Sequence, residues 1–265
     1  MRFVAPSRAD IPRSVYAALP LAAWGEYADW FARDAFPPVA DLNDGWTGAA
    51  GRRFVEQTPD LLADGLHYET RIARLGQIAT RAGNWHDFFN ALVWRRYAPI
   101  KASLNARQVA EIGVMGDKTR SRAQCALTHF DEGGVIVVVR DASLVDLWDA
   151  HDWHGLFWRE RAAWHDGRIE AQVFGHALLE MALVPHTVIT GKALAIDASV
   201  PAVAAVATAV ASARALNDPQ ELRPLPISGI PGWHRDNADE AFYRDAPCFK
   251  PLRPGRTYPA VLSRC

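Results

Sequence analysis

The side chains best suited to chemistry lie in two apolar stretches of the 265-residue chain. The first stretch, GNWHDFFNALVWRRYAP (residues 83–99), carries His86, Asp87 and Asn90 among aromatic residues. A helix that is apolar nearly all round is expected to be buried, and buried polar groups need partners. These three side chains are therefore predicted to face an interior cleft.

The second stretch, residues 168–184, places His176 and Glu180 four positions apart on one stripe of an expected helix. A buried glutamate without a cation or a hydrogen-bond donor would take up a proton. We therefore expect this helix to pack face to face with the helix of residues 84–97, so that the polar groups of both stretches converge.

Two kinds of chemistry are compatible with such a cluster. His86, Asp87, His176 and Glu180 form a mixed set of ligands that suits zinc, manganese or iron, and an open position on the metal would activate water. Without a metal, one histidine oriented by a carboxylate would act as a general base, with Asn90 as a substrate or oxyanion donor. A third alternative remains open, in which these groups only satisfy one another as a buried network.

Cationic residues near the first stretch point to an anionic substrate. Arg81, Arg95 and Lys101 are predicted to neutralise negative charge on the substrate or intermediate, and Trp94 is predicted to line the same cleft. From residue 95 to residue 122 the chain has seven basic residues against two acidic ones. This segment is either a solvated basic face or a surface that meets an anionic ligand or partner.

Several other classes of site and location are disfavoured. No Gly-x-Ser-x-Gly or Gly-x-Gly-x-x-Gly motif occurs, and the three cysteines lack metal-ligand spacing. Asp131 and Glu132 are assigned to a hairpin turn, where acidic residues are favoured by the backbone. A formal net charge of −1 provides no overall attraction for nucleic acid, and the longest uncharged run is too short to span a membrane. We expect a cytoplasmic protein.

The elements that would position these groups suggest a single α+β domain, in which several helices pack on a small, mainly antiparallel sheet. We expect hairpins over residues 66–81, 125–139 and 186–197, and helices over 84–97 and 168–184. From about residue 223, prolines and glycines indicate an extended tail. The ten tryptophans indicate either a thick aromatic core or an aromatic-walled cleft.

Four separated motifs resemble a known family. They are NWHDFFNALVW, LTHFDEGGV, FGHALLE and PISGIPGW followed by FYRD. Together they are similar to the bacterial proteins grouped as domain of unknown function 3025, over a region from Tyr68 to about residue 250. The resemblance implies no activity, cofactor or partner, so it assigns no site residue.

The sequence therefore favours a hydrolase that acts on a small anionic substrate in a His/carboxylate cleft. The alternative is a non-enzymatic protein that binds a ligand or partner through an aromatic cleft and the basic segment 95–122.

Overall fold

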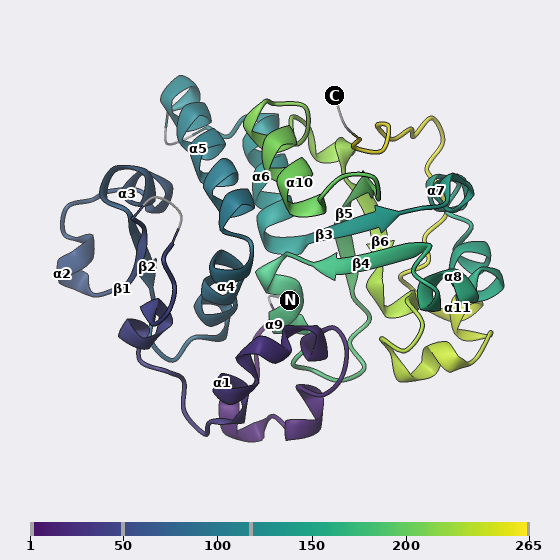
Figure 1. The fold of residues 1–265 in the computed structure, drawn as a ribbon, viewed down its shortest axis with the longest axis horizontal. Helices are drawn as coiled ribbons and strands as arrows, with labels where there is room; N and C mark the ends of the chain where they lie inside the picture. Colours follow the sequence, from purple (N-terminus) through teal and green to yellow (C-terminus); the bar gives the residue numbers. More distant parts are fainter. Residues whose placement is uncertain (1–2, 49–50, 117–118, 264–265) are drawn as a thin grey trace.

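A four-stranded mixed sheet forms the centre of the computed structural model, which describes residues 3–48, 51–116 and 119–263 (Figure 1). The strand order is β4-β3-β5-β6, with β3 parallel to β5 and with antiparallel β3–β4 and β5–β6 pairs. The strands are β3 Gly134–Val139, β4 Ile169–Val173, β5 Thr190–Asp197 and β6 Arg223–Pro226. The predicted α+β class is confirmed.

Helices surround this sheet, and Figure 1 shows α5, α6 and α10 to one side of it and α7, α8 and α11 to the other. All six residues of β3 are buried, as expected for a central strand made of a glycine followed by Val and Ile. The helices are α1 Ala28–Ala32, α2 Pro59–Leu62, α3 Tyr68–Leu75, α4 Trp85–Arg96, α5 Ala98–Met115, α6 Arg122–Gly133, α7 Ala142–Asp149, α8 Arg161–His165, α9 His176–Met181, α10 Ala202–Ala211 and α11 Phe242–Asp245. In the described part of the chain, no helix has the length and apolar character needed to cross a membrane.

A second, two-stranded sheet lies apart from the first, on the far side of α4 and α5 (Figure 1). Its strands β1 (Arg53–Glu56) and β2 (Gln77–Thr80) are parallel. The connection between them contains α2 and α3, and α3 packs on α5. The predicted hairpin over 66–81 is therefore wrong. Gly76 has a left-handed φ of 64° and closes α3, so the chain turns from a helix into β2 and does not fold back as a hairpin.

Aromatic residues fill the core around α4. Phe88 and Phe89 pack against Phe31 from the N-terminal segment, which lies beside α4, and Trp85 stacks on Phe89. Trp24, Trp94 and Trp148 are among the largest fully buried side chains. Of the two interpretations of the tryptophan excess, this packing favours a thick aromatic core.

The hairpin predicted over 125–139 is also wrong. Residues 122–133 form α6, which starts with a capping box between Ser121 and Gln124 and runs directly into β3. The capping box supplies partners for the first free backbone N–H groups of the helix, so a helix is favoured over a strand here.

The helix predicted over 168–184 is in fact strand β4 followed by helix α9, with Gly175 between them. A Cβ at Gly175 would lie 2.5 Å from the carbonyl oxygen of Glu132, so only glycine allows the chain to pass this close to the end of α6. His176 and Glu180 still share one helix, because both lie beyond the break.

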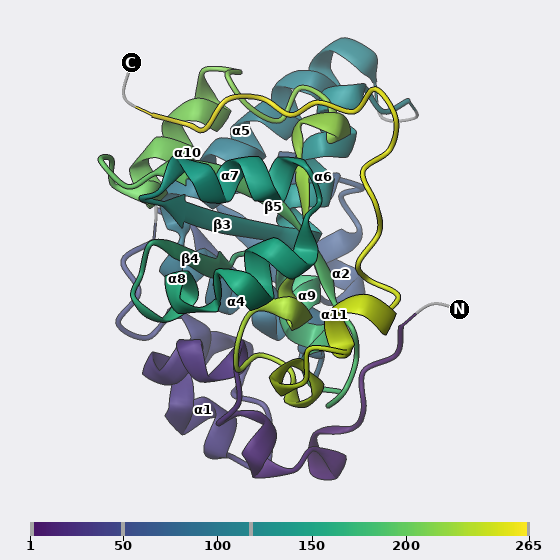
Figure 2. The same ribbon diagram turned by 90° about the vertical axis from the view of Figure 1, so that its right-hand side faces the viewer.

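The hairpin predicted over 186–197 is a single strand, β5, which pairs with β3 over six residues. A side chain at Gly191 would collide with Val135, which explains a glycine within the strand. Beyond β6 the tail contains α11 and then runs past α7 (Figure 2). It returns to the sheet where Leu262 bridges Ile196.

Candidate functional site

The expected contact between the two helices is present, and it brings two histidines together. α4 starts after Asn84, whose side chain accepts a hydrogen bond from the Asp87 backbone N–H at 3.0 Å, and His86 lies in its first turn. α9 starts at His176 itself. The Nε2 atoms of His86 and His176 are 3.0 Å apart, and His176 is only 3% exposed.

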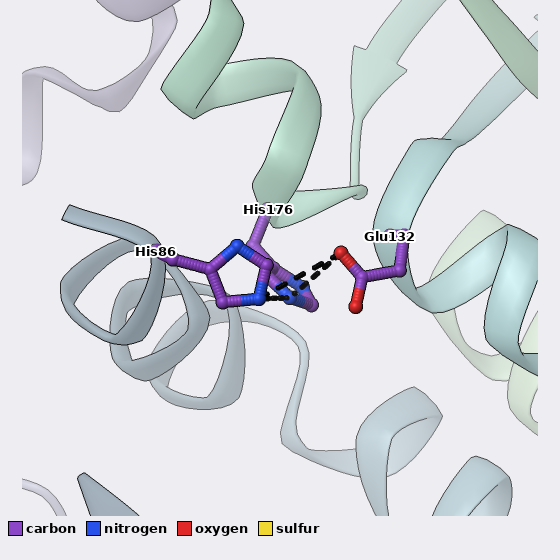
Figure 3. A group of neighbouring side chains, drawn as sticks. All are labelled: His86, Glu132 and His176. Atoms are coloured by element: carbon purple, nitrogen blue, oxygen red, sulfur yellow. Dashed lines mark hydrogen bonds and ion pairs between the residues drawn. The ribbon is translucent and has the colours of Figure 1, made fainter. Parts of the chain in front are cut away.

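A third group, Glu132 from the last turn of α6, completes a triad with His86 and His176 (Figure 3). Its Oε2 atom lies 3.3 Å from His176 Nε2 and 3.7 Å from His86 Nε2. Tetrahedral zinc with bonds of 2.0–2.1 Å to nitrogen and oxygen places its ligand atoms about 3.3–3.4 Å apart. The three atoms therefore form a triangle of the size needed to hold one divalent cation.

Nearby cationic groups favour the ionised form of Glu132. Burial alone would raise the pKa of its carboxyl group. The hydrogen bond and the charge of His176, together with the nearby His86 and Lys101, outweigh burial and lower the pKa of Glu132 to about 2. The carboxylate is therefore ionised at neutral pH.

Glu180 lies behind the triad and orients His86. Its Oε2 is 3.1 Å from His86 Nδ1, and this hydrogen bond is the main reason why the pKa of His86 is raised, although burial acts in the opposite direction. A proton held on Nδ1 leaves the Nε2 lone pair directed at the triad centre. In metal sites of proteins, a carboxylate often accepts a hydrogen bond from the second ring nitrogen of a ligating histidine and so fixes the histidine tautomer. The structure thus places Glu180 against Nδ1 of His86 and outside the triad, although the sequence allowed it to be a ligand.

The structure does not bring Asp87 into the triad. Arg81 binds both of its carboxylate oxygens, with Nη2 2.7 Å from Oδ1 and Nε 3.0 Å from Oδ2, and the Arg81 backbone N–H also donates to Oδ2. With both oxygens engaged, Asp87 closes a salt bridge at the wall of the site.

The triad lines a polar cavity of about 360 Å³ bounded by α3, β2, α4, α5, α6 and α9. Lys101, only 4% exposed, donates to Asn90 Oδ1 at 2.8 Å and to Asp131 Oδ1 at 2.6 Å. Asn90 in turn donates through Nδ2 to the Tyr68 hydroxyl at 2.9 Å. The side chains of His86, Glu132 and Asp131 are partly exposed, whereas those of His176 and Lys101 are only 4% exposed.

Arg95 lies away from this cavity. Its guanidinium donates to the carbonyl oxygens of Leu42 and Asp44 and packs over the ring of Trp30. Other cations of the segment 95–122 also have partners, in that Arg96 pairs with Glu26 and Arg122 with Asp218. Lys118 lies outside the described residues, and Arg120 is exposed and lines the cavity.

Several residues of the cavity wall lie in elements that the sequence pattern did not predict. Glu132 and Asp131 were assigned to a turn, and the signal that would have corrected this is the Ser121/Gln124 capping box that starts α6. Tyr68 and Glu69 were placed in a hairpin, although His67 caps the helix that carries them.

Burial of Glu69 in the cavity wall lowers the folding stability of the protein at neutral pH. Burial raises the pKa of its carboxyl group to about 7, against the smaller opposing effect of the hydrogen bond from Asn105 Nδ2 at 2.6 Å. Between pH 4.5 and 7 the folded protein keeps a proton that the unfolded chain has lost, so this group lowers stability as the pH rises.

The variant Glu69→Gln is therefore expected to unfold less readily than wild type at pH 8. The gain is about 3 kcal/mol, and it should vanish near pH 4.5, because glutamine carries no titrating proton and can still accept from Asn105. Urea unfolding at pH 4.5, 6 and 8 measures the difference. Glu56→Gln, at an exposed position, serves as the control, and an equal pH dependence in Glu69→Gln and wild type would contradict the expectation.

The variant Glu180→Gln is expected to bind a divalent metal about 10–100-fold more weakly, because the amide lacks the charge that polarises His86. Competition with a chromophoric chelator measures the affinity. Glu240→Gln alters a similar pair, in which His154 Nε2 lies 2.7 Å from Glu240 Oε1 outside the cavity, and should leave metal affinity unchanged. If both variants bind metal as tightly as wild type, Glu180 has no positioning role.

Comparison with known proteins identifies a family. Neither a search of curated proteins nor a search of solved structures gives a significant match to the chain. A family profile, described as a protein of unknown function, matches residues 52–253 and so covers α4, α6 and α9, which carry the triad. The chain therefore belongs to the DUF3025 family.

Proposed function

We propose that the protein is a metal-dependent hydrolase in which His86, Glu132 and His176 hold one divalent cation. The observation that carries this proposal is the convergence of two Nε2 atoms and one carboxylate oxygen at the wall of a polar cavity. Two histidines and one glutamate form the ligand set of several catalytic zinc sites, in which further positions stay open for water and substrate. The triad opens on the cavity, as such a site requires.

The residues around the triad suit a hydrolytic reaction. A bound cation would lower the pKa of a water molecule and polarise the bond to be cleaved. We propose Asp131 as the acceptor of the proton from water. Lys101 Nζ donates to its Oδ1, and its Oδ2 has no hydrogen bond within the described chain. Burial raises the pKa of the Tyr68 phenol, so its O–H stays protonated and available to the substrate.

The structure supports an anionic substrate less than the sequence does, because cations of the cavity wall are paired. Arg81 and Lys101 do line the cavity, but Asp87 and Asp131 already balance their charges, and the third cation of the lining, Arg120, is exposed to solvent. We therefore propose a small polar substrate, bound through Asn90, Tyr68 and the remaining N–H of Lys101.

A non-enzymatic binding protein is the competing proposal, and it has less support. Its aromatic cleft would use rings that pack in the core, and its basic segment would use cations that are mostly paired. A cytoplasmic location remains a prediction from composition.

Metal analysis of the untagged protein tests the proposed function. We expect close to one zinc or manganese ion per chain, together with hydrolysis of members of a panel of chromogenic esters and amides that a chelator abolishes and added metal restores. Failure of Zn²⁺, Mn²⁺ and Fe²⁺ to bind in equilibrium dialysis would overturn the proposal. Bound iron with oxygen consumption would replace hydrolysis by oxidation, since the same ligand set serves non-haem iron.

A further inference from the structure

Glu69 on α3 is the one carboxyl group of the described cavity wall that has no basic side chain as a partner. Four carboxyl groups line the cavity. The other three contact basic side chains, namely Asp87 with Arg81, Asp131 with Lys101, and Glu132 with His86 and His176. None of the ion pairs within the described chain includes Glu69, so no cation directly stabilises its negative charge.

The carboxyl group of Glu69 is held by a neutral side chain. Its Oε2 atom accepts a hydrogen bond from Asn105 Nδ2 at 2.6 Å, and the same Nδ2 group also donates to the Glu69 backbone carbonyl at 2.9 Å. Its Oε1 atom accepts no hydrogen bond within the described chain, and it is not among the fully buried atoms that lack a partner. Since Glu69 is partly exposed and lines the cavity, Oε1 has surface that a bound molecule can reach.

The surroundings of Glu69 favour the protonated form of its carboxyl group. Burial raises the pKa of Glu69 to about 7, and the hydrogen bond from Asn105 opposes this rise in part. The charge of Asp131, on α6, raises the pKa further, and the charge of Lys101, on α5, lowers it. Near neutral pH, a large share of the Glu69 side chains therefore carry a proton that they can donate.

The remaining titratable groups near Glu69 do not pair with its carboxyl group. Strand β2, which α3 also contacts, has no titratable side chain. On the helix of Glu69 itself, burial keeps the Tyr68 phenol protonated by raising its pKa, and His67 Nδ1 accepts from the Glu69 backbone N–H at 3.3 Å. Arg120 lines the cavity but is exposed, and it forms no ion pair with Glu69.

Glu69 and Asp131 thus line the same cavity with opposite properties. The Lys101 ammonium group, 2.6 Å from Asp131, favours the carboxylate form of Asp131, whereas Glu69 has no such partner. Two carboxyl groups whose surroundings favour opposite protonation states can serve as the base and the acid of one reaction. Their partners on α5, Lys101 and Asn105, lie one turn apart, or about 6 Å along the helix.

We propose that Glu69 is the general acid of the hydrolysis and donates its proton to the leaving group. This inference rests on the proposed function and names the substrate class, which is an amide or an alkyl ester. The leaving groups of these compounds, an amine or an alkoxide, need a proton in order to depart.

The proton transfers balance over one turnover. The oxygen of water bonds to the carbonyl carbon, and the proton of water passes to Asp131. The C–N or C–O bond breaks, and the proton of Glu69 bonds to the leaving nitrogen or oxygen. The products are a carboxylic acid and an amine or alcohol, with no change of oxidation state. Asp131 then releases a proton to solvent and Glu69 takes one up, so both groups return to their starting states.

The effect of Glu69 on stability agrees with a catalytic role. A carboxyl group buried without a cation lowers stability at neutral pH, and glutamine would accept the same hydrogen bond without this cost. Groups that reduce stability are typical of active sites, where stability and activity compete. Glu69→Gln is therefore expected to gain stability and lose activity, whereas loss of a purely structural hydrogen-bonding group would lower stability.

Kinetics on two substrates with the same acyl group and different leaving groups test the inference. A 4-nitrophenyl ester releases 4-nitrophenolate, which departs without a proton, whereas the matching 4-nitroanilide releases an amine whose nitrogen must be protonated. Glu69→Gln is expected to cleave the anilide about 10²–10⁴-fold more slowly than wild type, the usual contribution of a positioned general acid. The loss on the ester should be much smaller, because its leaving group needs no acid.

The pH dependence of the rate provides a second measurement. Wild-type kcat/KM on the anilide should fall as the pH rises above about 7, because Glu69 then loses the proton that it must donate. Glu69→Gln should lack this fall, since glutamine does not titrate. Glu69→Asp keeps an acid and should recover part of the anilide activity.

The matched control is Glu111→Gln. Glu111 is also a partly exposed glutamate whose Oε2 accepts a hydrogen bond at 2.6 Å from a neutral side chain, the Ser121 hydroxyl, but it does not line the cavity. This variant should keep the wild-type rates on both substrates.

The acid assignment and the proposed function fail separately. Equal losses of Glu69→Gln on ester and anilide, no loss on the anilide, or a wild-type protein that cleaves esters but no anilide would overturn the assignment and leave the hydrolase proposal standing. A wild-type protein that cleaves neither class of substrate would overturn both.

Discussion

Alanine at His86 or at His176 is expected to lower the metal content from about one ion per chain to about a tenth or less. Loss of an outer-shell partner alone weakens metal binding about 10–100-fold, so loss of one of three ligands should exceed that range. Elemental analysis after gel filtration measures the stoichiometry. The matched control is His154→Ala, which removes a histidine of similar exposure that is paired with Glu240 elsewhere on the surface.

Thermal unfolding of the same variants distinguishes a metal centre from a network of buried groups that only satisfy one another. A metal that binds only the folded protein stabilises it by about 2.7 kcal/mol when present at 100 times its Kd. We therefore expect a chelator to lower the melting temperature of wild type but not of His86→Ala. If the chelator changes neither protein and His86→Ala is simply destabilised, the cluster is structural.

Replacing Asp131 with asparagine is expected to lower kcat by about 10²–10⁴-fold, the usual contribution of a positioned general base. Metal content should stay near one ion per chain, because Asp131 is not a ligand. Asparagine keeps an oxygen for Lys101 Nζ but cannot accept the proton of water. Steady-state kinetics on the best ester or amide of the panel, alongside metal analysis, measures both quantities.

The control for this variant is Asp149→Asn. Asp149 pairs with Arg223, a cation that is 4% exposed like Lys101, in a region away from the cavity. It should retain wild-type kcat. Equal losses in the two variants would mean that the effect comes from weakening a buried ion pair, and it would exclude Asp131 as the base.

The contact between α4 and α9 could be predicted from the sequence because local rules were sufficient there. Asn84 and the apolar positions that follow it specify α4, and the helical period places His86 on a face that a second helix can meet. His176 and Glu180 lie one turn apart on α9, as their four-residue spacing predicts. The predicted helix was too long, but the break at Gly175 precedes both residues. The meeting of His86, His176 and Glu180 could therefore be anticipated.

Glu132 could not be anticipated in the same way. The position of Glu132 depends on α6 being a helix. The run of Val and Ile residues that follows α6 instead favoured the prediction of a hairpin. The position also depends on pairings far apart in the sequence, since β3 lies between β4 and β5 and is parallel to β5. Asp87 shows the opposite error, because Arg81, six residues earlier, takes up its carboxylate locally.

The close approach of Gly175 to the end of α6 has a consequence for the order of assembly. Val135 pairs with Val173 in the β3–β4 ladder, and Glu132 and His176 each lie three residues beyond that pair. The distance between these two side chains is thus set by strand register, and a slip of one residue would separate them. Since a strand pairing across so many residues forms late in folding, nascent chains should acquire metal only after the sheet has closed. The cation would then stabilise the native fold after it has formed and would not start its folding.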